Sequence, residues 1–130
     1  MSDLSASVKA AISGMQAQAN RLRHTSENIA NADTPGYRRK VVTFEEVHQG
    51  ARPTGSVETG PVRLDAAPLP KIHDPSHPLA NQAGFYEGSN VDLVIEIADA
   101  REAQRSYQAN LKIFEQAREM SRNLFNLLRR

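Results

Sequence analysis

The chain of 130 residues contains no cysteine and no tryptophan, and only 5% of its residues are aromatic. The absence of cysteine excludes disulfide bonds and thiolate metal sites, and it removes the usual clue to a redox compartment. The scarcity of aromatic residues leaves few large side chains to anchor a dense globular core. The length suffices for one modest domain and is short for two.

A strong net charge and a long apolar run are also lacking. The charges nearly cancel, leaving a formal net charge of +1, which gives no long-range attraction to nucleic acid or to anionic membranes. No apolar run approaches the roughly 20 residues that a membrane-spanning helix requires, so we expect no membrane insertion. Residues 1–5 lack the charged and apolar regions of a secretory signal. The sequence therefore predicts a cytoplasmic protein, or one exported by a route that reads no cleavable signal.

Motifs for catalysis and cofactor binding are missing as well. There is no Gly-x-Ser-x-Gly turn and no glycine-rich phosphate loop. His73, Asp74 and His77 suggest a metal site at first sight. However, Pro75 and Pro78 disfavour the helix that an i, i+4 pair of histidine ligands requires. We therefore predict no enzyme, no cofactor and no metal site.

A long helix is predicted near the N-terminus, from about Asp3 to Ile29. It would be roughly 40 Å long at 1.5 Å per residue. Apolar or small residues recur there in alternating steps of four and three, the spacing that keeps one narrow stripe facing a partner helix. We call this stripe the N-terminal seam; it consists of Val8, Ile12, Met15, Ala19, Leu22, Ser26 and Ile29.

A second, longer helix is predicted at the other end of the chain. Val91 to Leu128 contains neither glycine nor proline, and a helix over this range would be roughly 55 Å long. Ser89 and the acidic residues after it predict an N-terminal cap. Asn110 is a polar residue in the apolar stripe, so it either fixes the register of helix pairing or faces water. The C-terminal seam consists of Ala100, Ala103, Tyr107, Asn110, Phe114, Ala117, Ser121, Leu124 and Leu128.

The segment from Arg38 to Gly88 differs in character, because it holds all but one of the seven prolines and only short apolar runs. Proline disfavours long regular structure, while Thr59-Gly60 suggests a small hairpin. A short basic cluster, residues 38–40, opens the segment. A nucleic-acid surface would need more such charge on one face, so we expect either a solvated loop or an acidic neighbour for this cluster.

The predicted fold class is mainly α. Two long terminal helices would pack as an antiparallel coiled-coil-like pair, joined by an extended, proline-rich middle with at most short β strands. Residues 1–37 would form the N-terminal helix and a Pro-Gly turn, 38–88 the extended middle with a possible small hairpin, and 89–130 the C-terminal helix. The first and last parts would form one helical core. Narrow, alanine-rich seams need each other, and neighbouring subunits, to be stable, which favours an assembly subunit over an enzyme.

The stretch Asn-Ile-Ala-Asn-Ala-Asp-Thr-Pro-Gly-Tyr, residues 28–37, ends the first helix in a predicted tight turn. Pro35 presets φ at the second turn position, and Gly36 accepts the positive φ that a type II turn needs next. The stretch resembles the N-terminal signature of the bacterial flagellar axial proteins, the rod and hook subunits. Its signature residues are Asn28, Asn31, Thr34, Pro35, Gly36 and Tyr37.

Two further motifs extend this resemblance. Residues 105–110, Arg-Ser-Tyr-Gln-Ala-Asn, are similar to a motif of the C-terminal helix in these proteins. Residues 74–78, Asp-Pro-Ser-His-Pro, followed by Ser-Asn-Val at 89–91, are similar to a segment of one proximal rod subunit type. A related rod-subunit type shares the N-terminal signature without this middle segment and stays an alternative. A non-flagellar coiled-coil adaptor is a second alternative.

Membership in this family would imply a structural role without a cofactor. Such subunits assemble helically with other rod proteins and with copies of themselves into the drive shaft that crosses the periplasm and transmits torque. They leave the cytoplasm through the flagellar type III export apparatus, without a cleaved signal peptide, and reside in the basal body. The signature residues at 28–37 would then act in assembly. We expect helix packing and register to depend on Met15, Leu22, Ile29, Arg105, Tyr107, Asn110, Phe114 and Leu124.

Overall fold

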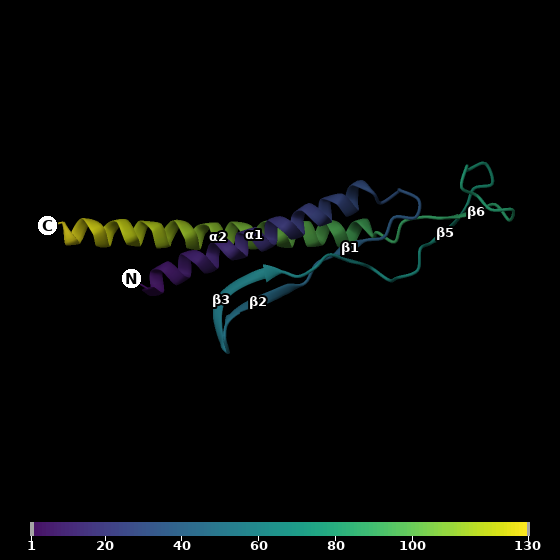
Figure 1. Ribbon diagram of the computed structural model, residues 1–130. Helices are drawn as coiled ribbons and strands as arrows, with labels where there is room; N and C mark the ends of the chain where they lie inside the picture. The colour runs from purple at the N-terminus through teal and green to yellow at the C-terminus, as the bar shows by residue number, and fades with distance from the viewer. Residues whose placement is uncertain (1, 130) are drawn as a thin grey trace.

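Two long helices, α1 (Ser2–Ala30) and α2 (Leu93–Leu128), dominate the computed structural model, which describes residues 2–129. They run side by side in opposite directions, so that the start of α1 and the end of α2 lie at the same end of an elongated molecule (Figure 1). Met1 and Arg130, the outer limits of the two predicted helical parts, lie outside the described residues. Within 2–129 neither helix combines the length and the apolar character that crossing a membrane would take.

The start of α2 differs slightly from the prediction. Its N-cap is Asp92, whose carboxylate accepts the Val94 N–H at 3.0 Å, as side chains at this position commonly do. Ser89, the predicted cap, lies outside the helix, and its Oγ accepts the Val91 N–H at 3.2 Å. The helix therefore begins at Leu93 instead of Val91.

The prediction of an extended, proline-rich middle is wrong. Among the described residues, the chain between the helices forms three separate two-stranded antiparallel sheets. The fold therefore consists of two helices and several short antiparallel strands. The sheets pair β1 (Lys40–Val41) with β4 (Arg63–Leu64), β2 (Phe44–Gln49) with β3 (Arg52–Thr59), and β5 (Lys71–His73) with β6 (Phe85–Glu87).

The prolines permit these strands because a two-stranded sheet consists only of edge strands. Pro53 lies inside β3, opposite His48, and proline is tolerated on an edge where no ladder donor is needed. The β2–β3 hairpin turns at Gly50, which has a φ of 65°, a value that glycine adopts without strain. The predicted hairpin turn at Thr59-Gly60 is therefore misplaced, since Thr59 is the last residue of β3.

The interior of the molecule is thin. Among the described residues, the buried hydrophobic side chains are those of four alanines: Ala11, Ala17, Ala103 and Ala117. The β2–β3 hairpin packs on one side of α1 and below the helix pair in Figure 1. Two hydrogen bonds hold it there: the Val57 N–H donates to Ser13 Oγ at 3.1 Å, and Asn20 Nδ2 donates to Thr59 Oγ1 at 3.2 Å.

Candidate functional site: a buried polar junction and a groove between the helices

Polar side chains gather where the N-terminal signature, β1 and the start of α2 meet. Asn28 is 1% exposed and Glu96 is fully buried, and these are the largest fully buried side chains of the described chain. The centre of this junction is thus polar instead of apolar. We call the group the junction cluster; its members are Asn28, Tyr37, Arg39, Lys40, Asn90, Glu96 and Asp99.

Asn28 uses every hydrogen-bonding position of its amide. Its Nδ2 donates to the Lys40 carbonyl at 2.9 Å and to Glu96 Oε2 at 3.3 Å. Its Oδ1 accepts the Lys40 N–H and the Tyr37 hydroxyl, each at 2.9 Å. Because an amide offers two donors and one acceptor with two lone pairs, this side chain is fully satisfied. It ties the end of α1 to the turn, to β1 and to α2.

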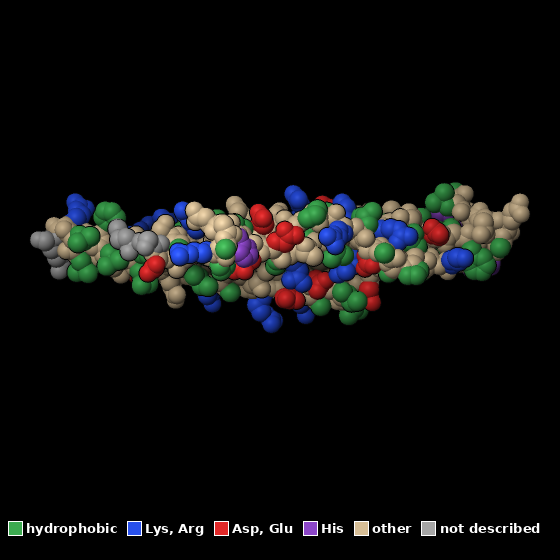
Figure 2. Space-filling model, turned by 60° about the horizontal axis from the view of Figure 1, so that its bottom comes forward, with side chains coloured by type: hydrophobic (Ala, Val, Ile, Leu, Met, Phe, Trp, Pro, Cys, Tyr) green, Lys and Arg blue, Asp and Glu red, His purple; other side chains and the backbone are tan. Residues whose placement is uncertain are grey.

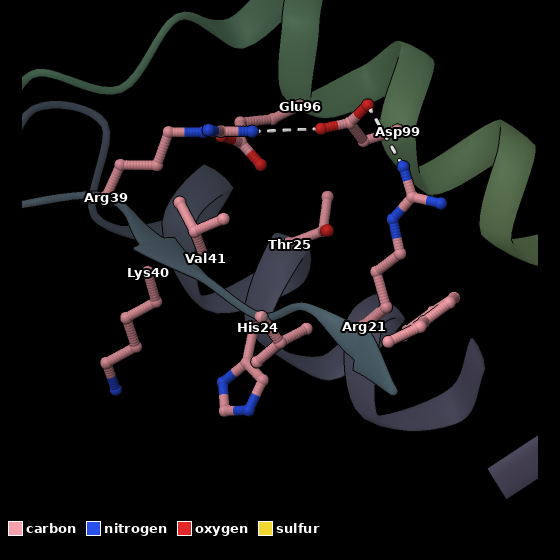
Figure 3. A pocket seen from close by; sticks show the side chains of 10 residues that line it. Arg21, His24, Thr25, Arg39, Lys40, Val41, Glu96 and Asp99 are labelled. Carbon is pink, nitrogen blue, oxygen red and sulfur yellow. Dashed lines mark hydrogen bonds and ion pairs between the residues drawn. The ribbon is translucent and has the colours of Figure 1, made fainter. Parts of the chain in front are cut away.

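The buried Glu96 carboxylate is balanced by Arg39, whose Nε donates to Glu96 Oε1. Arg39 also donates through Nη2 to Asp99 Oδ2 at 2.9 Å, and Asp99 Oδ1 accepts from Arg21 Nη2 at 3.3 Å (Figure 3). Burial would lower the pKa of Arg39, but the hydrogen bond to Glu96 and the neighbouring carboxylates outweigh it and raise that pKa. A buried charge is tolerated only when it is paired. The positions of α1, of α2 and of Arg39, which directly precedes β1, therefore depend on one another.

The rim of the cluster holds a further ion pair. Lys40 Nζ donates to Glu27 Oε2 at 2.7 Å, and this hydrogen bond lowers the pKa of Glu27 and raises the pKa of Lys40. Burial raises the pKa of the Tyr37 hydroxyl. The basic cluster at 38–40 therefore has acidic neighbours, the second of the two situations expected for it.

Asn90, just before α2, joins three segments of backbone. Its Oδ1 accepts the Arg39 N–H at 2.7 Å, and its Nδ2 donates to the carbonyls of Asp65 and Ala67 at 3.2 and 3.1 Å. Its own N–H donates to the Tyr37 carbonyl at 3.4 Å. The segment before α2 is thus bonded both to the turn after α1 and to the chain that follows β4.

The predicted turn residues form a hydrogen-bonded turn. The Tyr37 N–H donates to the Thr34 carbonyl at 3.2 Å, and Gly36 has a φ of 75°. Since no non-glycine residue among 2–129 has a positive φ, this is the arrangement of a type II turn. The Gly36 N–H also donates to the carbonyls of Glu87 and Gly88 at 3.2 and 3.3 Å, so the turn is bonded to the end of β6.

The other signature residues lie beside this turn. Asn31 Nδ2 donates to the Glu27 carbonyl at 2.8 Å, and its Oδ1 accepts from Thr34 Oγ1 at 3.1 Å. The Glu27 carbonyl also accepts the backbone N–H of Asn31 at 3.1 Å, so Asn31 is bonded to the last turn of the helix by both its backbone and its side chain. Pro35 is half-buried within the turn.

The face of α1 that packs inward differs from the predicted N-terminal seam, whereas the face of α2 follows the predicted C-terminal seam. In that seam Ala103 and Ala117 are buried, and Ala100, Asn110, Phe114 and Ser121 are half-buried. The buried residues of α1 are Ala11, Gly14, Ala17, His24, Thr25 and Asn28, and those of α2 are Glu96, Ala103 and Ala117. Of the predicted packing residues, Met15, Leu22, Ile29, Asn110 and Phe114 are half-buried, and Arg105, Tyr107 and Leu124 are exposed. Small residues therefore form the direct contact between the helices, and the larger predicted residues lie beside it or face outward.

Asn110 lies against Gly14 across this contact. A Cβ atom at Gly14 would be 2.8 Å from Asn110 Nδ2, which is closer than real Cβ contacts come. The amide of Asn110 donates to the Ser106 carbonyl of its own helix at 3.0 Å. Its position thus reflects a steric fit into the space that glycine leaves.

Glu96, Arg39, Asp99 and Asn90 were not identified as site residues from the sequence. A usable signal exists for two of them, because Glu96 and Asp99 are three residues apart and so share a face of the helix. The basic cluster at 38–40 is their complement in charge. Their separation in sequence hid the pairing, since Arg39 and Glu96 are 57 residues apart.

The hollow in Figure 3 lies between α1 and the chain after the turn and has a volume of about 220 Å³. His24 lines it, and the buried Nδ1 of this ring has no hydrogen-bond partner within residues 2–129. Glu27 Oε2 is 3.6 Å from that nitrogen. Within the described chain no group of three side chains could hold a metal ion; His73 packs edge-on against Phe85, and His77 stacks on Tyr86.

A groove of about 800 Å³ runs between the two helices. We call it the lateral groove. Apolar side chains and hydrogen-bond donors share its lining, and no acidic residue takes part. Its lining residues are Ala19, Leu22, Arg23, Ser26, Gln104, Tyr107, Gln108 and Leu111. Three residues of the N-terminal seam, at 19, 22 and 26, therefore face this groove.

Comparison with known proteins matches both ends of the chain. Residues 9–38 match the family model described as flagella basal body rod protein, and residues 82–127 match the flagellar basal body rod FlgEFG protein C-terminal model. The chain is 41% identical to the flagellar basal-body rod protein FlgC of Agrobacterium fabrum, over 99% of this chain and 98% of that protein. It is 34% identical to the protein of the same name from Salmonella typhimurium, over 83% of this chain and 85% of that protein. The two matched regions contain the signature and α2, which the junction cluster connects.

Proposed function

Since this chain belongs to the flagellar basal-body rod proteins and is FlgC-like, it is a structural subunit of the basal-body rod and not an enzyme, and we propose that it lies in the proximal rod and contacts further copies of itself. Membership in the family means that it assembles with other rod or basal-body proteins. The resemblance to FlgC proteins covers nearly the whole chain. This favours the FlgC type over the related rod-subunit type and over a non-flagellar adaptor.

The surface of α2 is the observation that carries the proposal. This helix is apolar on several faces, yet its own chain buries only Glu96, Ala103 and Ala117 of it. A helix of this kind is normally covered by its surroundings, which here are neighbouring subunits. Its exposed large hydrophobic residues are Leu93, Val94, Ile95, Ile97, Tyr107, Leu111, Ile113, Met120, Leu124, Phe125, Leu127 and Leu128.

The junction cluster supports a mechanical role for the signature. A drive shaft must keep the angle between its subunits' helices and the attached β segments under load. Asn28 and Glu96 connect both helices to β1 through buried hydrogen bonds, and the turn at Gly36 bonds to the end of β6. Residues 1–37 and 89–130 would thus act as one helical core, with 38–88 attached to it at fixed angles.

The thin core also supports export in an unfolded state through the flagellar type III apparatus. Unfolding exposes little apolar surface when the buried hydrophobic residues are four alanines, and the stabilisation lost on unfolding scales with that area. Unfolding before export would therefore require little work. Refolding would then be completed by packing against subunits already in the rod.

Basal bodies purified from cells in which a tagged version replaces this chain would test the proposal. Electron microscopy of the labelled particles should place the tag in the rod near its cytoplasmic end. An untagged strain provides the matched control for background labelling. Labelling at the distal end of the rod, or basal bodies without the tag in motile cells, would contradict the proximal position.

A further inference from the structure

We propose that the lateral groove receives the β2–β3 hairpin of a second copy of this chain. The inference rests on the proposed function, since it names the surfaces through which copies would meet in the rod. Its basis is twofold. The groove between the helices is uncovered, and two glutamates on the hairpin have no ion-pair partner among residues 2–129.

The groove has the features of a surface that is covered in the assembled state. Its floor is apolar, with Leu22 half-buried and Leu111 37% exposed. Tyr107 also lines it and is 39% exposed. The N-terminal seam has the spacing of a stripe that faces a partner, and part of that stripe lies in the groove instead of against α2. No segment among residues 2–129 covers this floor.

The rim of the groove offers hydrogen-bond donors and positive charge. Arg23, Gln104 and Gln108 line it, and Arg101 and Arg105 follow on the adjoining face of α2, one turn from the two glutamines. None of the three arginines forms an ion pair within the described chain. The groove is therefore suited to a partner that brings carboxylates.

The hairpin carries such carboxylates in an arrangement that its own chain does not explain. Glu45 and Glu58 lie directly opposite each other on β2 and β3, and both are exposed. Like charges in directly opposed positions destabilise a strand pair. Neither carboxylate forms an ion pair with any residue among 2–129. A basic partner surface would remove this repulsion.

The acidic pair also points away from α1. Residues on a strand alternate between its faces, and Val57 and Thr59 are bonded to α1. Glu58, between them, therefore lies on the outer face, together with Glu45. Figure 2, in which the lower side of Figure 1 comes forward, shows acidic and basic side chains interspersed near the middle of the molecule.

The groove and the hairpin lie on different sides of α1. Asn20 is bonded to the hairpin. At 3.6 residues per turn, the groove residues Ala19, Leu22 and Ser26 lie about 100° to 160° from Asn20 around the helix, and Arg23 lies about 60° from it. A copy displaced sideways therefore presents its hairpin to the groove of its neighbour. Such a contact joins different surfaces of the two copies, so it propagates from copy to copy.

The two surfaces are also offset along the helix axis. The hairpin meets α1 between Ser13 and Asn20, whereas the groove spans residues 19–26 of α1. Six residues at 1.5 Å correspond to an offset of about 9 Å. Successive copies would thus be displaced both sideways and along the axis, which produces a helical arrangement instead of a flat ring.

Disulfide cross-linking tests the contact directly, because the native chain contains no cysteine. We would combine Gln108→Cys in the groove with Ser56→Cys on the outer face of the hairpin, in cells where this variant is the only copy. Isolated basal bodies would then be treated with copper phenanthroline, which oxidises nearby thiol pairs to disulfides. We expect cross-linked dimers and higher multimers of this chain, identified by mass spectrometry.

Single-cysteine chains and a displaced pair are the matched controls. Each single variant should remain monomeric on a non-reducing gel, and so should Gln108→Cys combined with Leu79→Cys, a residue in the distant loop between β5 and β6. Incorporation of the variant into basal bodies without dimers would overturn the inference while leaving the rod function intact. A disulfide to a different rod protein, or dimers from Gln108→Cys alone, would also overturn it. Absence of the chain from the rod would instead contradict the proposed function.

Charge reversal provides a second measurement. Arg23→Glu and Glu58→Lys should each lower the yield of complete rods several-fold, because each places like charges in the contact. The double variant should recover most of the yield, since it restores an attractive pair in reverse order. A double variant no better than the weaker single variant would contradict the pairing of these surfaces.

Discussion

At the scale of single residues, the connection between the helices and the β segments depends on a few buried polar atoms. Asn28 and Glu96 are buried almost completely, and their hydrogen bonds reach α1, the turn, β1 and α2. A satisfied buried network is stable, but each group becomes costly when its partner is removed. Substitutions in the junction cluster should therefore have larger effects than substitutions of exposed ion pairs.

Glu96→Ala should reduce stability by about 1 to 3 kcal/mol, because it removes an acceptor of the buried Asn28 amide and the buried partner of Arg39, which keeps its ion pair with Asp99. Glu102→Ala is the matched control, since Glu102 pairs with Arg21 but is 66% exposed in its side chain, and such pairs contribute at most about 1 kcal/mol. Thermal unfolding followed by circular dichroism, with trimethylamine N-oxide added to favour the folded state, would measure both. Equal losses for the two variants would show that Glu96 is not specially buried.

Gly36→Val should impair rod assembly more than export. Valine strongly disfavours the φ of 75° found at Gly36, so the chain would leave α1 at a different angle and lose its bonds to the end of β6. Export depends on the unfolded chain and should be little affected. Secreted or periplasmic protein and rod yield, measured in the same cells, would separate the two steps. Normal rods would contradict the role given to this turn.

The pH dependence of stability should form a plateau with losses on both sides. The pKa values of Lys40 and Tyr37 are raised in the fold. Their contribution to the free energy of unfolding is therefore fully present below about pH 10, where these groups titrate in the unfolded chain, and it is lost as the pH rises through their higher pKa values in the folded chain. The pKa of Glu27 is lowered, so its contribution is present above about 4.3 and is lost as the pH falls. Unfolding midpoints measured from pH 3 to 11 in sucrose, an osmolyte that does not titrate in this range, would test this, with Tyr37→Phe expected to flatten the alkaline side.

At the scale of the elements, the antiparallel helix pair is closest where small residues face each other. Gly14, on α1, has no Cβ and so makes room for the amide of Asn110 on α2. A glycine inside a helix costs about 1 kcal/mol against alanine. At this position the contact between Gly14 and the Asn110 amide offsets that loss, because a larger residue would leave no room for the amide.

Gly14→Ala should therefore destabilise the helix pair even though alanine is the better helix former. Its Cβ would lie 2.8 Å from Asn110 Nδ2, so either the Asn110 amide gives up its hydrogen bond to the Ser106 carbonyl or the helices move apart. Asn110→Ala removes the clash, so the double variant should be more stable than Gly14→Ala alone. A double-mutant cycle on helix content and on rod yield would measure the coupling. Additive effects would show that the two residues act independently.

At the scale of the whole molecule, the chain is long and thin, and its buried apolar core consists of four alanines. A fold with so little buried apolar area has little stability of its own. Large exposed hydrophobic residues along α2 instead suit contacts with neighbours. Folding of this chain and assembly of the rod are thus expected to be coupled.

The isolated chain at micromolar concentration should consequently be poorly folded. The two helices contain 29 and 36 residues, and circular dichroism should show much less helix than these would supply. The signal should rise when trimethylamine N-oxide is added or when concentration drives association. A cooperative thermal transition with nearly full helicity at low concentration would rule out this coupling.

Local signals in the sequence determined the two helices and the tight turn that follows the first helix. The first helix was predicted from about Asp3 to Ile29 and is found at Ser2–Ala30, because apolar periodicity and the absence of proline act over neighbouring residues. The turn needs a residue with positive φ, and Gly36 supplies it where the signature ends. Such features depend on residues a few positions apart.

Only the tertiary structure decided which faces meet and how the middle pairs. The apolar stripe of α1 was assigned to α2, but small residues make that contact because they allow the closest approach of two helices. The proline-rich middle forms strand pairs such as Lys40 with Leu64, which proline content alone disfavours but an edge strand tolerates. Arg39 meets Glu96 from 57 positions away. These contacts join residues that are far apart in the sequence, and several partners compete for each of them. Such contacts leave no periodic pattern among neighbouring residues from which they could be predicted.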